Sequence, residues 1–268
     1  MKTKVIYWVI FTLIFTASLI TPGNCETLPP DNVQTDDNVI PGVTLETIIK
    51  RLDALYRSDT AYAEMEMTIQ TPHWERTLTM KSWSEGLNKT FIVIESPRRE
   101  RGITTLRKGN EMWNFFPKIN KVMKIPPSMM MGSWMGSDFT NDDLVKESTR
   151  IKDYHARLLQ EKNRPTCLVE FIPLKETVSL WGKIISEIDK KTLLPISEIF
   201  YDEENKKIRE LYFKEVKTFG NKTIPAVMEL IPTTKKDHKT IVRYTSAVFD
   251  VPLDKETFTL RNLQKKRR

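Results

Sequence analysis

Few side chains in this sequence could carry out chemistry, and their spacing does not favour catalysis. His73, His155 and His238 lie far apart, and none has the spacing of a zinc-ligand pair. The sequence also lacks a Gly-x-Ser-x-Gly nucleophile motif and a glycine-rich phosphate loop. We therefore expect a protein that is not an enzyme and that uses no cofactor.

The densest group of oxygen ligands is Asp138, Asn141, Asp142 and Asp143. A metal site is one interpretation, but the group lacks the alternating ligands, central glycine and distal glutamate of an EF-hand. Thr140 with an acidic residue three positions later is instead typical of a capped helix N-terminus. We expect a helix that starts near Thr140, no metal, and an Asp138 carboxylate that accepts backbone N–H groups at the start of that helix.

The cysteines predict no disulfide in the secreted protein. Cys25 lies at the end of an apparent export signal, which leaves Cys167 alone in the strand-like stretch Pro165-Thr-Cys-Leu-Val-Glu-Phe. A buried structural thiol is the expected state for a lone cysteine in such a strand.

Apolar side chains in flexible settings are the stronger functional signal. Six of the eleven methionines lie between Met112 and Met135, and three in succession stand between Pro-Pro and Gly-Ser. Methionine adapts to apolar shapes of many kinds, and three in a row cannot all face one core. We expect a mobile Met-rich cover over an apolar ligand, with ordinary core packing as the alternative. The candidate ligand-binding residues are Trp113, Phe115, Met129, Met130, Met131, Trp134, Met135 and Phe139.

Glycines flank part of this cover, so packing there should contribute less to stability than packing in the sheet. We expect serine at both Met130 and Trp134 to weaken ligand binding while changing thermal stability little.

The elements that must position these residues are mostly strands. Residues 43–56 predict one helix with an apolar face, and 61–70 alternate apolar and polar side chains with the period of a half-buried strand. With only two or three helices and ten or so strands, we predict a mainly β (α+β) fold built on one large antiparallel sheet. The other predicted strands are 74–83, 89–95, 103–107, 112–116, 122–125, 154–161, 167–173, 183–189, 196–201, 208–219, 226–231 and 240–249.

The two ends of the chain suggest export. Residues 1–25 have the charged start and apolar stretch of a cleavable signal peptide, with lipidation of Cys25 as the alternative to a free soluble form. Residues 26–41 have the composition of a disordered leader, and 261–268 form a basic tail that is solvated or drawn to anionic lipid. The formal charge of +7 alone would allow nucleic acid as a partner, but an export signal argues against it.

A family resemblance rests on separated motifs. The runs Gly102-Ile-Thr-Thr-Leu-Arg, Met112-Trp-Asn-Phe-Phe-Pro and Gly136-Ser-Asp-Phe-Thr-Asn-Asp-Asp-Leu are similar to the LolA-like family of outer-membrane lipoprotein-sorting proteins. The closest similarity is to the branch with the GSDF…DL signature. The resemblance implies a curved sheet that forms an unclosed half-barrel over residues 42–260, with an apolar hollow covered by a few helices.

The same resemblance implies a monomeric periplasmic carrier. It would bind acyl chains of lipoproteins or lipids and move them from an inner-membrane donor or exporter toward an outer-membrane acceptor. The alternative is an envelope sensor of lipoprotein or lipid, or an accessory module of a membrane exporter. Arg98, Arg99 and Arg101 form a basic cluster that could contact a partner or a lipid headgroup, although a solvated loop is the simpler interpretation.

Overall fold

The computed structural model describes residues 38–40, 42–56, 58–145, 150–159, 164–175 and 181–265. These residues all belong to one compact unit, Asp36–Arg268. The predicted signal peptide with Cys25, most of the predicted leader, and residues 266–268 lie outside the described residues.

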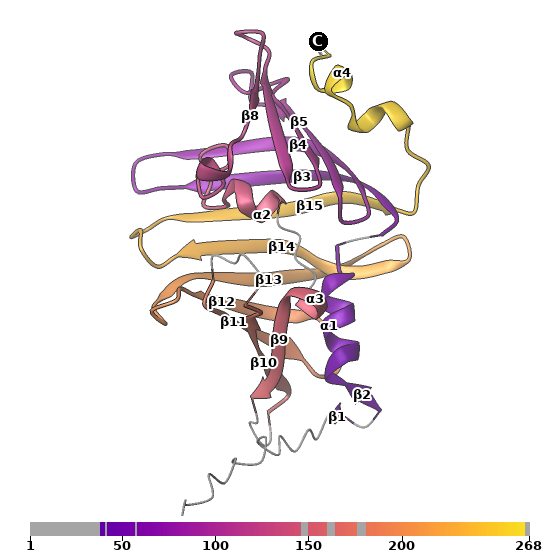
Figure 1. Cartoon of the computed structure of the whole chain (residues 1–268), viewed down its shortest axis with the longest axis vertical. Helices are drawn as coiled ribbons and strands as arrows, with labels where there is room; N and C mark the ends of the chain where they lie inside the picture. The colour runs from indigo at the N-terminus through magenta and orange to yellow at the C-terminus, as the bar shows by residue number, and fades with distance from the viewer. Residues whose placement is uncertain are drawn as a thin grey trace, which may run out of the picture. The chain divides into compact units, whose positions relative to one another are not determined.

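One antiparallel sheet of 13 strands dominates this unit, as the sequence predicts (Figure 1). Its order is β8-β7-β6-β5-β4-β3-β15-β14-β13-β12-β11-β10-β9, so that β3 and β15 join the two halves of the chain at the centre. The strands are β3 Thr60–Gln70, β4 Glu75–Glu85, β5 Lys89–Ser96, β6 Thr104–Lys108, β7 Glu111–Phe116, β8 Lys121–Lys124, β9 Tyr154–Leu159, β10 Thr166–Pro173, β11 Lys183–Asp189, β12 Pro195–Tyr201, β13 Lys207–Phe219, β14 Lys222–Pro232 and β15 Lys239–Phe249.

The sheet is curved and does not close on itself. The strands at its two ends run steeply across the direction of the central strands β3, β15, β14 and β13 (Figure 1). Among the described residues, β8 pairs only with β7 and β9 only with β10, so both edges are open. This is the predicted unclosed half-barrel, and it confirms the expected mainly β fold.

Each predicted strand is present, with ends shifted by a few residues. The largest shift is in β14, which begins at Lys222 rather than at the predicted Ala226. The ladder continues through Pro225, which lies opposite Val216 and beside Glu215, a residue with φ of +53°. The irregular backbone at Glu215 accommodates a proline that has no N–H to donate.

The helices are short, and most lie on the inner face of the sheet. Helix α1 (Leu45–Asp53) is capped by the Thr44 hydroxyl, which accepts from the Thr47 N–H at 3.2 Å. Its buried residues Ile48, Ile49 and Leu52 pack on strands β10–β14, as the apolar stripe predicts. The remaining short elements are β1 Asn38–Ile40, β2 Val43–Thr44, the 3₁₀ turn η1 Pro127–Met129, α2 Asn141–Val145, α3 Arg150–Asp153, η2 Lys255–Phe258 and α4 Leu260–Leu263.

Two segments assigned to the chain ends contribute structure. Asn38–Ile40, at the end of the predicted leader, pairs with β2 across a turn in which Gly42 has φ of +81°. At the other end, α4 places Leu263 of the predicted tail in an outer-face cluster, and the Thr104 hydroxyl donates to the Leu263 carbonyl at 2.8 Å. That buried leucine and its hydrogen bond anchor the start of the basic tail on the sheet.

Two apolar clusters fill the inner face, one on each side of the sheet centre. One lies under α1 on β10–β14, and the other lies on β3–β5, β7 and β15 under Trp134. Within the part of the chain that the structure describes, no helix has the length and apolar character needed to cross a membrane.

Candidate functional site

A cavity of about 360 Å³ lies between the two inner-face clusters. This volume falls at the lower end of the range for ligand-binding sites. Its walls come from α1, the loop before α2, α2 and α3, and seven strands on both sides of the centre. The lining residues are Leu52, Asp53, Leu55, Tyr56, Met65, Met67, Met80, Ser82, Ser84, Thr90, Ile92, Trp134, Phe139, Leu144, Arg150, Pro195, Glu198, Leu211, Phe213, Met228, Val242 and Tyr244.

The cavity exists because the central strands present flexible or small side chains to it. Met65, Met67 and Met80 from β3 and β4 line it together with Met228 from β14. Further along β4 and β5 the inward positions are the small residues Ser82, Ser84 and Thr90, and Ser84 pairs with Thr90 across the strands. Small side chains leave space and methionines adapt to what fills it, which suits an apolar ligand of variable shape.

The end of α1 forms one wall through an aromatic pair. The rings of Tyr56 and Tyr244 stack with centroids 5.4 Å apart, and the Tyr56 hydroxyl donates to the Pro225 carbonyl at 2.9 Å. Burial raises the pKa of Tyr56 far above its ordinary value, with smaller contributions from Tyr244 and Glu198. Tyr56 therefore stays protonated and serves as an apolar wall with a satisfied polar tip.

The charged groups at the cavity wall are paired with one another. The Arg150 guanidinium donates to Glu198 at 2.6 Å, and the Ser186 hydroxyl donates to the same carboxylate oxygen at 3.0 Å. The Arg150 backbone N–H donates to Asp53 at 3.1 Å. One guanidinium between two carboxylates makes a hydrogen-bonded polar wall.

The Met-rich segment, residues 128–136, is anchored at several points. The Asn141 amide donates to the Met129 carbonyl at 3.0 Å, and the Asp142 N–H donates to the Met130 carbonyl at 2.8 Å. Trp134 is only 3% exposed, and its indole N–H donates to the Thr105 hydroxyl at 3.2 Å. The segment is therefore a hydrogen-bonded cover rather than the free flap expected from its glycines. The Trp134 side chain is part of the inner-face core, which argues against the expectation that it adds little to stability.

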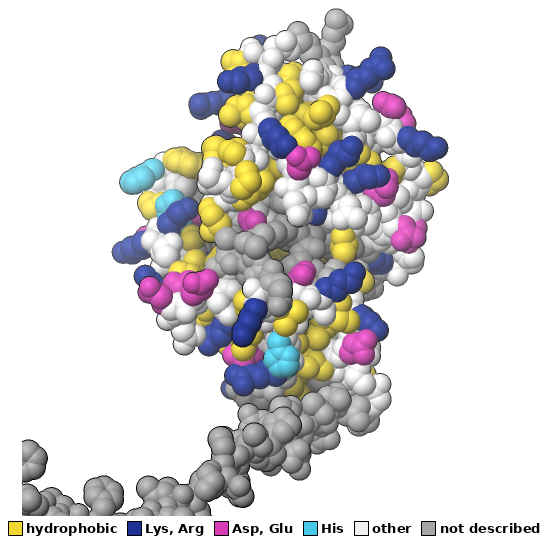
Figure 2. Space-filling model, in the orientation of Figure 1, with side chains coloured by type: hydrophobic (Ala, Val, Ile, Leu, Met, Phe, Trp, Pro, Cys, Tyr) yellow, Lys and Arg dark blue, Asp and Glu magenta, His cyan; other side chains and the backbone are white. Residues whose placement is uncertain are grey.

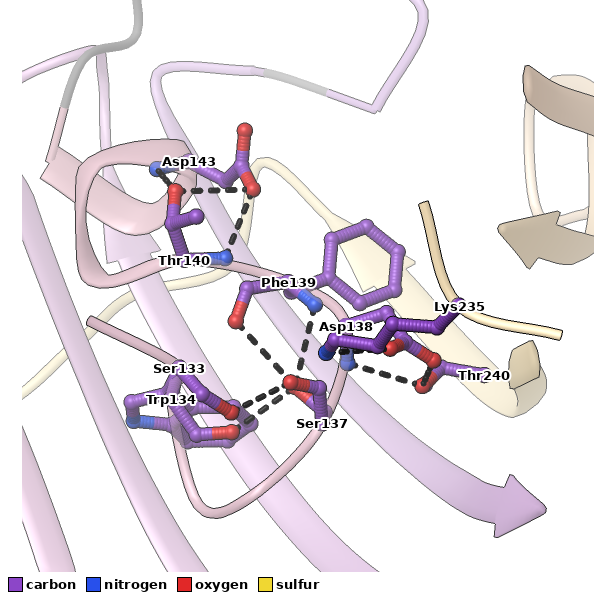
Figure 3. A network of polar contacts seen from close by, with 9 residues as sticks. All are labelled: Ser133, Trp134, Ser137, Asp138, Phe139, Thr140, Asp143, Lys235 and Thr240. Carbon is purple, nitrogen blue, oxygen red and sulfur yellow. Dashed lines mark hydrogen bonds and ion pairs between the residues drawn. The ribbon is translucent and has the colours of Figure 1, made fainter. Parts of the chain in front are cut away.

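Ser137 is the centre of the loop that follows this segment (Figure 3). Its side chain is buried, and its hydroxyl donates to the Trp134 carbonyl at 2.7 Å and accepts from the Phe139 N–H at 3.2 Å. The Trp134 N–H also donates to the Phe139 carbonyl at 2.8 Å. These bonds hold Trp134 and Phe139 in place so that both side chains reach the cavity.

Asp138 does not cap the helix, contrary to our expectation. Its carboxylate accepts from the Thr240 hydroxyl at 2.8 Å and from Lys235 at 3.2 Å, while its own N–H donates to the Thr240 hydroxyl at 3.0 Å (Figure 3). Thr240 is fully buried at the start of β15. Asp138 therefore links the loop to the central strand, a long-range contact that the local sequence pattern does not reveal.

Gly136 of the same motif has a steric role. Its φ is +77°, and a Cβ atom there would lie 3.1 Å from Nη2 of Arg76. The same guanidinium donates to the Met135 carbonyl and pairs with Glu100 at 3.1 Å. Glycine is the residue that permits both this backbone conformation and the close approach of Arg76.

The capping interpretation of Thr140 and Asp143 is confirmed. Asp143 accepts from the Thr140 N–H at 2.8 Å, and the Thr140 hydroxyl accepts from the Asp143 N–H at 3.1 Å (Figure 3). Both Arg209 Nη atoms also donate to the Asp143 carboxylate at 2.7 Å, and the guanidinium lies 4.3 Å from the Trp181 and Phe200 ring centroids.

The environment of Asp143 keeps it charged. Burial alone would raise the pKa of Asp143, but the charge of Arg209 and hydrogen bonds from Arg209 and Thr140 together lower it. Among the described residues, no group of three His, Cys, Asp or Glu side chains is placed to hold a metal ion. Cys167 is a free buried thiol whose pKa is raised by burial.

The structure divides the eight predicted ligand-binding residues into four pairs. Trp134 and Phe139 line the cavity, while Met130 and Met135 pack, half-buried, against the cluster behind it. Met129 and Met131 are exposed at the surface. Trp113 and Phe115 belong to the outer-face cluster under α4, on the opposite side of the sheet.

The basic cluster lies in the turn after β5, away from the residues that line the cavity. Arg98, Arg99 and Arg101 are all exposed there.

The sequence interpretation missed most of the cavity wall. Met65, Met67, Met80, Met228 and Tyr244 come from strands that were predicted but were assigned no functional role. The usable signal was the methionine at inward positions of strands that otherwise alternate cleanly.

Three solved structures share this fold. A DUF1329 family protein from Desulfovibrio piger aligns with a TM-score of 0.72 and 21% identity, over 81% of this chain and 96% of that protein. A putative outer membrane lipoprotein-sorting protein domain from Vibrio parahaemolyticus aligns with a TM-score of 0.70 and 20% identity, over 81% and 96%. A LolA superfamily protein from Nitrosomonas europaea aligns with a TM-score of 0.69 and 18% identity, over 82% and 99%.

The chain therefore has the fold of these three proteins, in agreement with the LolA-like resemblance found in the sequence. The chain belongs to the family whose model, described as "Uncharacterized protein", matches residues 86–265. No curated protein matches the chain.

Proposed function

We propose that this protein is a periplasmic carrier that binds the acyl chains of lipoproteins or lipids in the inner-face cavity and moves them toward the outer membrane. The observation that carries the proposal is the cavity itself, which has methionine, aromatic and aliphatic walls and lies under an anchored cover. The fold shared with a putative lipoprotein-sorting domain supports the same class of ligand.

Binding of an acyl chain in such a site requires few polar contacts. Each methylene transferred from water into the cavity contributes about 0.8 kcal/mol, so an acyl chain binds well without a hydrogen bond. The volume of about 360 Å³ suits one chain better than two or three. The carrier would receive its cargo from an inner-membrane donor or exporter and release it to an outer-membrane acceptor that binds the chain more tightly.

A cavity-filling variant tests the proposal. Ser84 lines the cavity, whereas Lys81 on the same strand is on the other face, so Ser84→Phe and Lys81→Phe add the same ring inside and outside. The inner ring should displace two or three methylenes of ligand and lower the affinity for a fluorescent fatty acid about tenfold or more.

Titration of the wild type and both variants measures this effect, with thermal melting as the control for folding. Unchanged affinity in a folded Ser84→Phe variant would show that the ligand does not occupy this cavity.

The molecules that co-purify with the protein distinguish a sensor or accessory role from a carrier role. Lipid or lipoprotein favours a carrier, whereas a stable protein complex without lipid favours a sensor or an exporter accessory.

A further inference from the structure

The β8 edge of the sheet, residues 117–131, exposes an unusual amount of apolar surface. Ile119 is 66% exposed in the turn before β8, Met123 is 36% exposed on the strand, and Met129 and Met131 are 50% and 53% exposed after it. In Figure 2, hydrophobic side chains gather over this end of the visible face, with Lys and Arg side chains among and around them. Contiguous exposed apolar surface on a soluble protein marks a binding surface.

The charge on this edge has one sign. Lys118, Lys121 and Lys124 alternate with the apolar residues, and the sequence has no Asp or Glu between Met112 and Ser137. Lys124 is paired with Glu111, while Lys118 and Lys121 are exposed. Lysines on an edge strand discourage pairing with another strand, but that role does not account for four exposed apolar side chains beside them.

We propose that the β8 edge docks on the surface of an anionic lipid bilayer. Apolar side chains at the headgroup boundary combined with lysines near lipid phosphates are the two attractions that hold a protein on such a surface. Protein interfaces, in contrast, are enriched in aromatic residues and arginine and depleted in lysine. A second copy of this chain would bring lysines against lysines.

The position of this edge connects docking with the cavity. Met129 and Met131 face outward from the same short segment whose Trp134 forms part of the cavity wall. The segment is tied to the start of α2 by the bonds from Asn141 and Asp142. A docked β8 edge therefore places the cover of the cavity at the bilayer surface.

Vesicle flotation tests the proposal with the purified protein. Vesicles of phosphatidylcholine containing phosphatidylglycerol as the minority lipid should bind the wild type, and pure phosphatidylcholine vesicles should bind it far less. Lys118→Gln with Lys121→Gln should weaken binding to the anionic vesicles by about fivefold per lysine, with a weaker dependence on salt. Ile119→Ser with Met129→Ser and Met131→Ser should also reduce binding to those vesicles.

Matched controls use exposed residues elsewhere. Val216 is 56% exposed on β13 and Lys206 is exposed before it, so Val216→Ser and Lys206→Gln should bind as the wild type does. Three results would each overturn the proposal. All variants could bind the vesicles equally, or binding could be lost only when residues 266–268 are removed. The third result is a wild-type dimer that dissociates in the apolar variant. Fatty-acid binding is measured in the same β8-edge variants. If they still bind the fatty acid, a negative flotation result counts against membrane docking and not against the cavity proposal.

Discussion

The ion pair between Asp143 and Arg209 connects the start of α2 with strand β13. The carboxylate satisfies the N-terminus of α2 and accepts two hydrogen bonds from a guanidinium that two aromatic rings enclose. Leu144, the next residue, lines the cavity. The pair therefore holds one part of the cavity wall on β13. The sequence predicts the local cap, but the partner 66 residues away could not be read from it.

Replacing Asp143 by asparagine should destabilise the fold by about 3 kcal/mol, because it leaves the buried Arg209 charge without its partner. Glu95→Gln, which breaks an exposed pair with Lys81, is the control and should have little effect. Urea denaturation near neutral pH measures both changes. A loss in Asp143→Asn no larger than in the control would contradict the assigned role.

The same pair predicts a pH dependence. The pKa of Asp143 is lowered in the folded state, so its contribution is present above the unfolded value of about 4 and is lost as pH falls through the folded value. The stability difference between wild type and Asp143→Asn should therefore be largest near neutral pH and shrink below about pH 4. A difference that stays constant down to acid pH would exclude this linkage.

Thr240 gives a second test at the residue scale. Thr240→Val keeps the shape but removes the hydroxyl that both donates to and accepts from Asp138, and unsatisfied buried groups cost about 1–3 kcal/mol. Thr240→Ser keeps the hydroxyl and is the matched control. Limited proteolysis within residues 128–136 should be faster in Thr240→Val than in Thr240→Ser. Equal rates would mean that this link does not hold the loop.

At the scale of elements, the sequence predicts strands well because the order of apolar and polar residues in each strand indicates which side chains are buried. Strand β3 alternates buried and half-buried residues except at Met65 and Glu66, and the apolar stripe of α1 faces the sheet. Which face of the sheet a residue occupies also follows from alternation, but which face carries the cavity does not. Trp113 and Phe115 illustrate this, because α4 covers them from a segment more than 140 residues away.

The contacts of the Met-rich segment also could not be predicted from the local sequence. Its composition indicates a cover, but its anchoring depends on Thr105 and Asn141, which no local pattern singles out. Trp134→Ser should therefore destabilise the protein by about 3–5 kcal/mol, as expected for a buried aromatic side chain. Trp74→Ser, at a tryptophan that is 47% exposed, should cost far less. Thermal melting distinguishes the two, and similar small losses would restore the free-flap interpretation.

At the scale of the whole sheet, curvature brings two apolar clusters to face each other across a gap. Strands β3 and β15 join the halves, and their inward positions carry Met65, Met67, Val242 and Tyr244. Side chains of this size do not fill the space between α1 and Trp134. The sequence indicates the half-barrel through its family motifs, whereas the cavity depends on how the two halves bend toward each other.

The most direct test of the central claim is mass spectrometry of organic extracts from protein purified out of the periplasm. The wild type and the outer-face Lys81→Phe variant should release acyl lipid in proportion to protein. Ser84→Phe, whose ring occupies the cavity, should release far less at the same yield of folded protein. Equal lipid from all three proteins, or none from the wild type, would contradict the account of this cavity as an acyl-chain site.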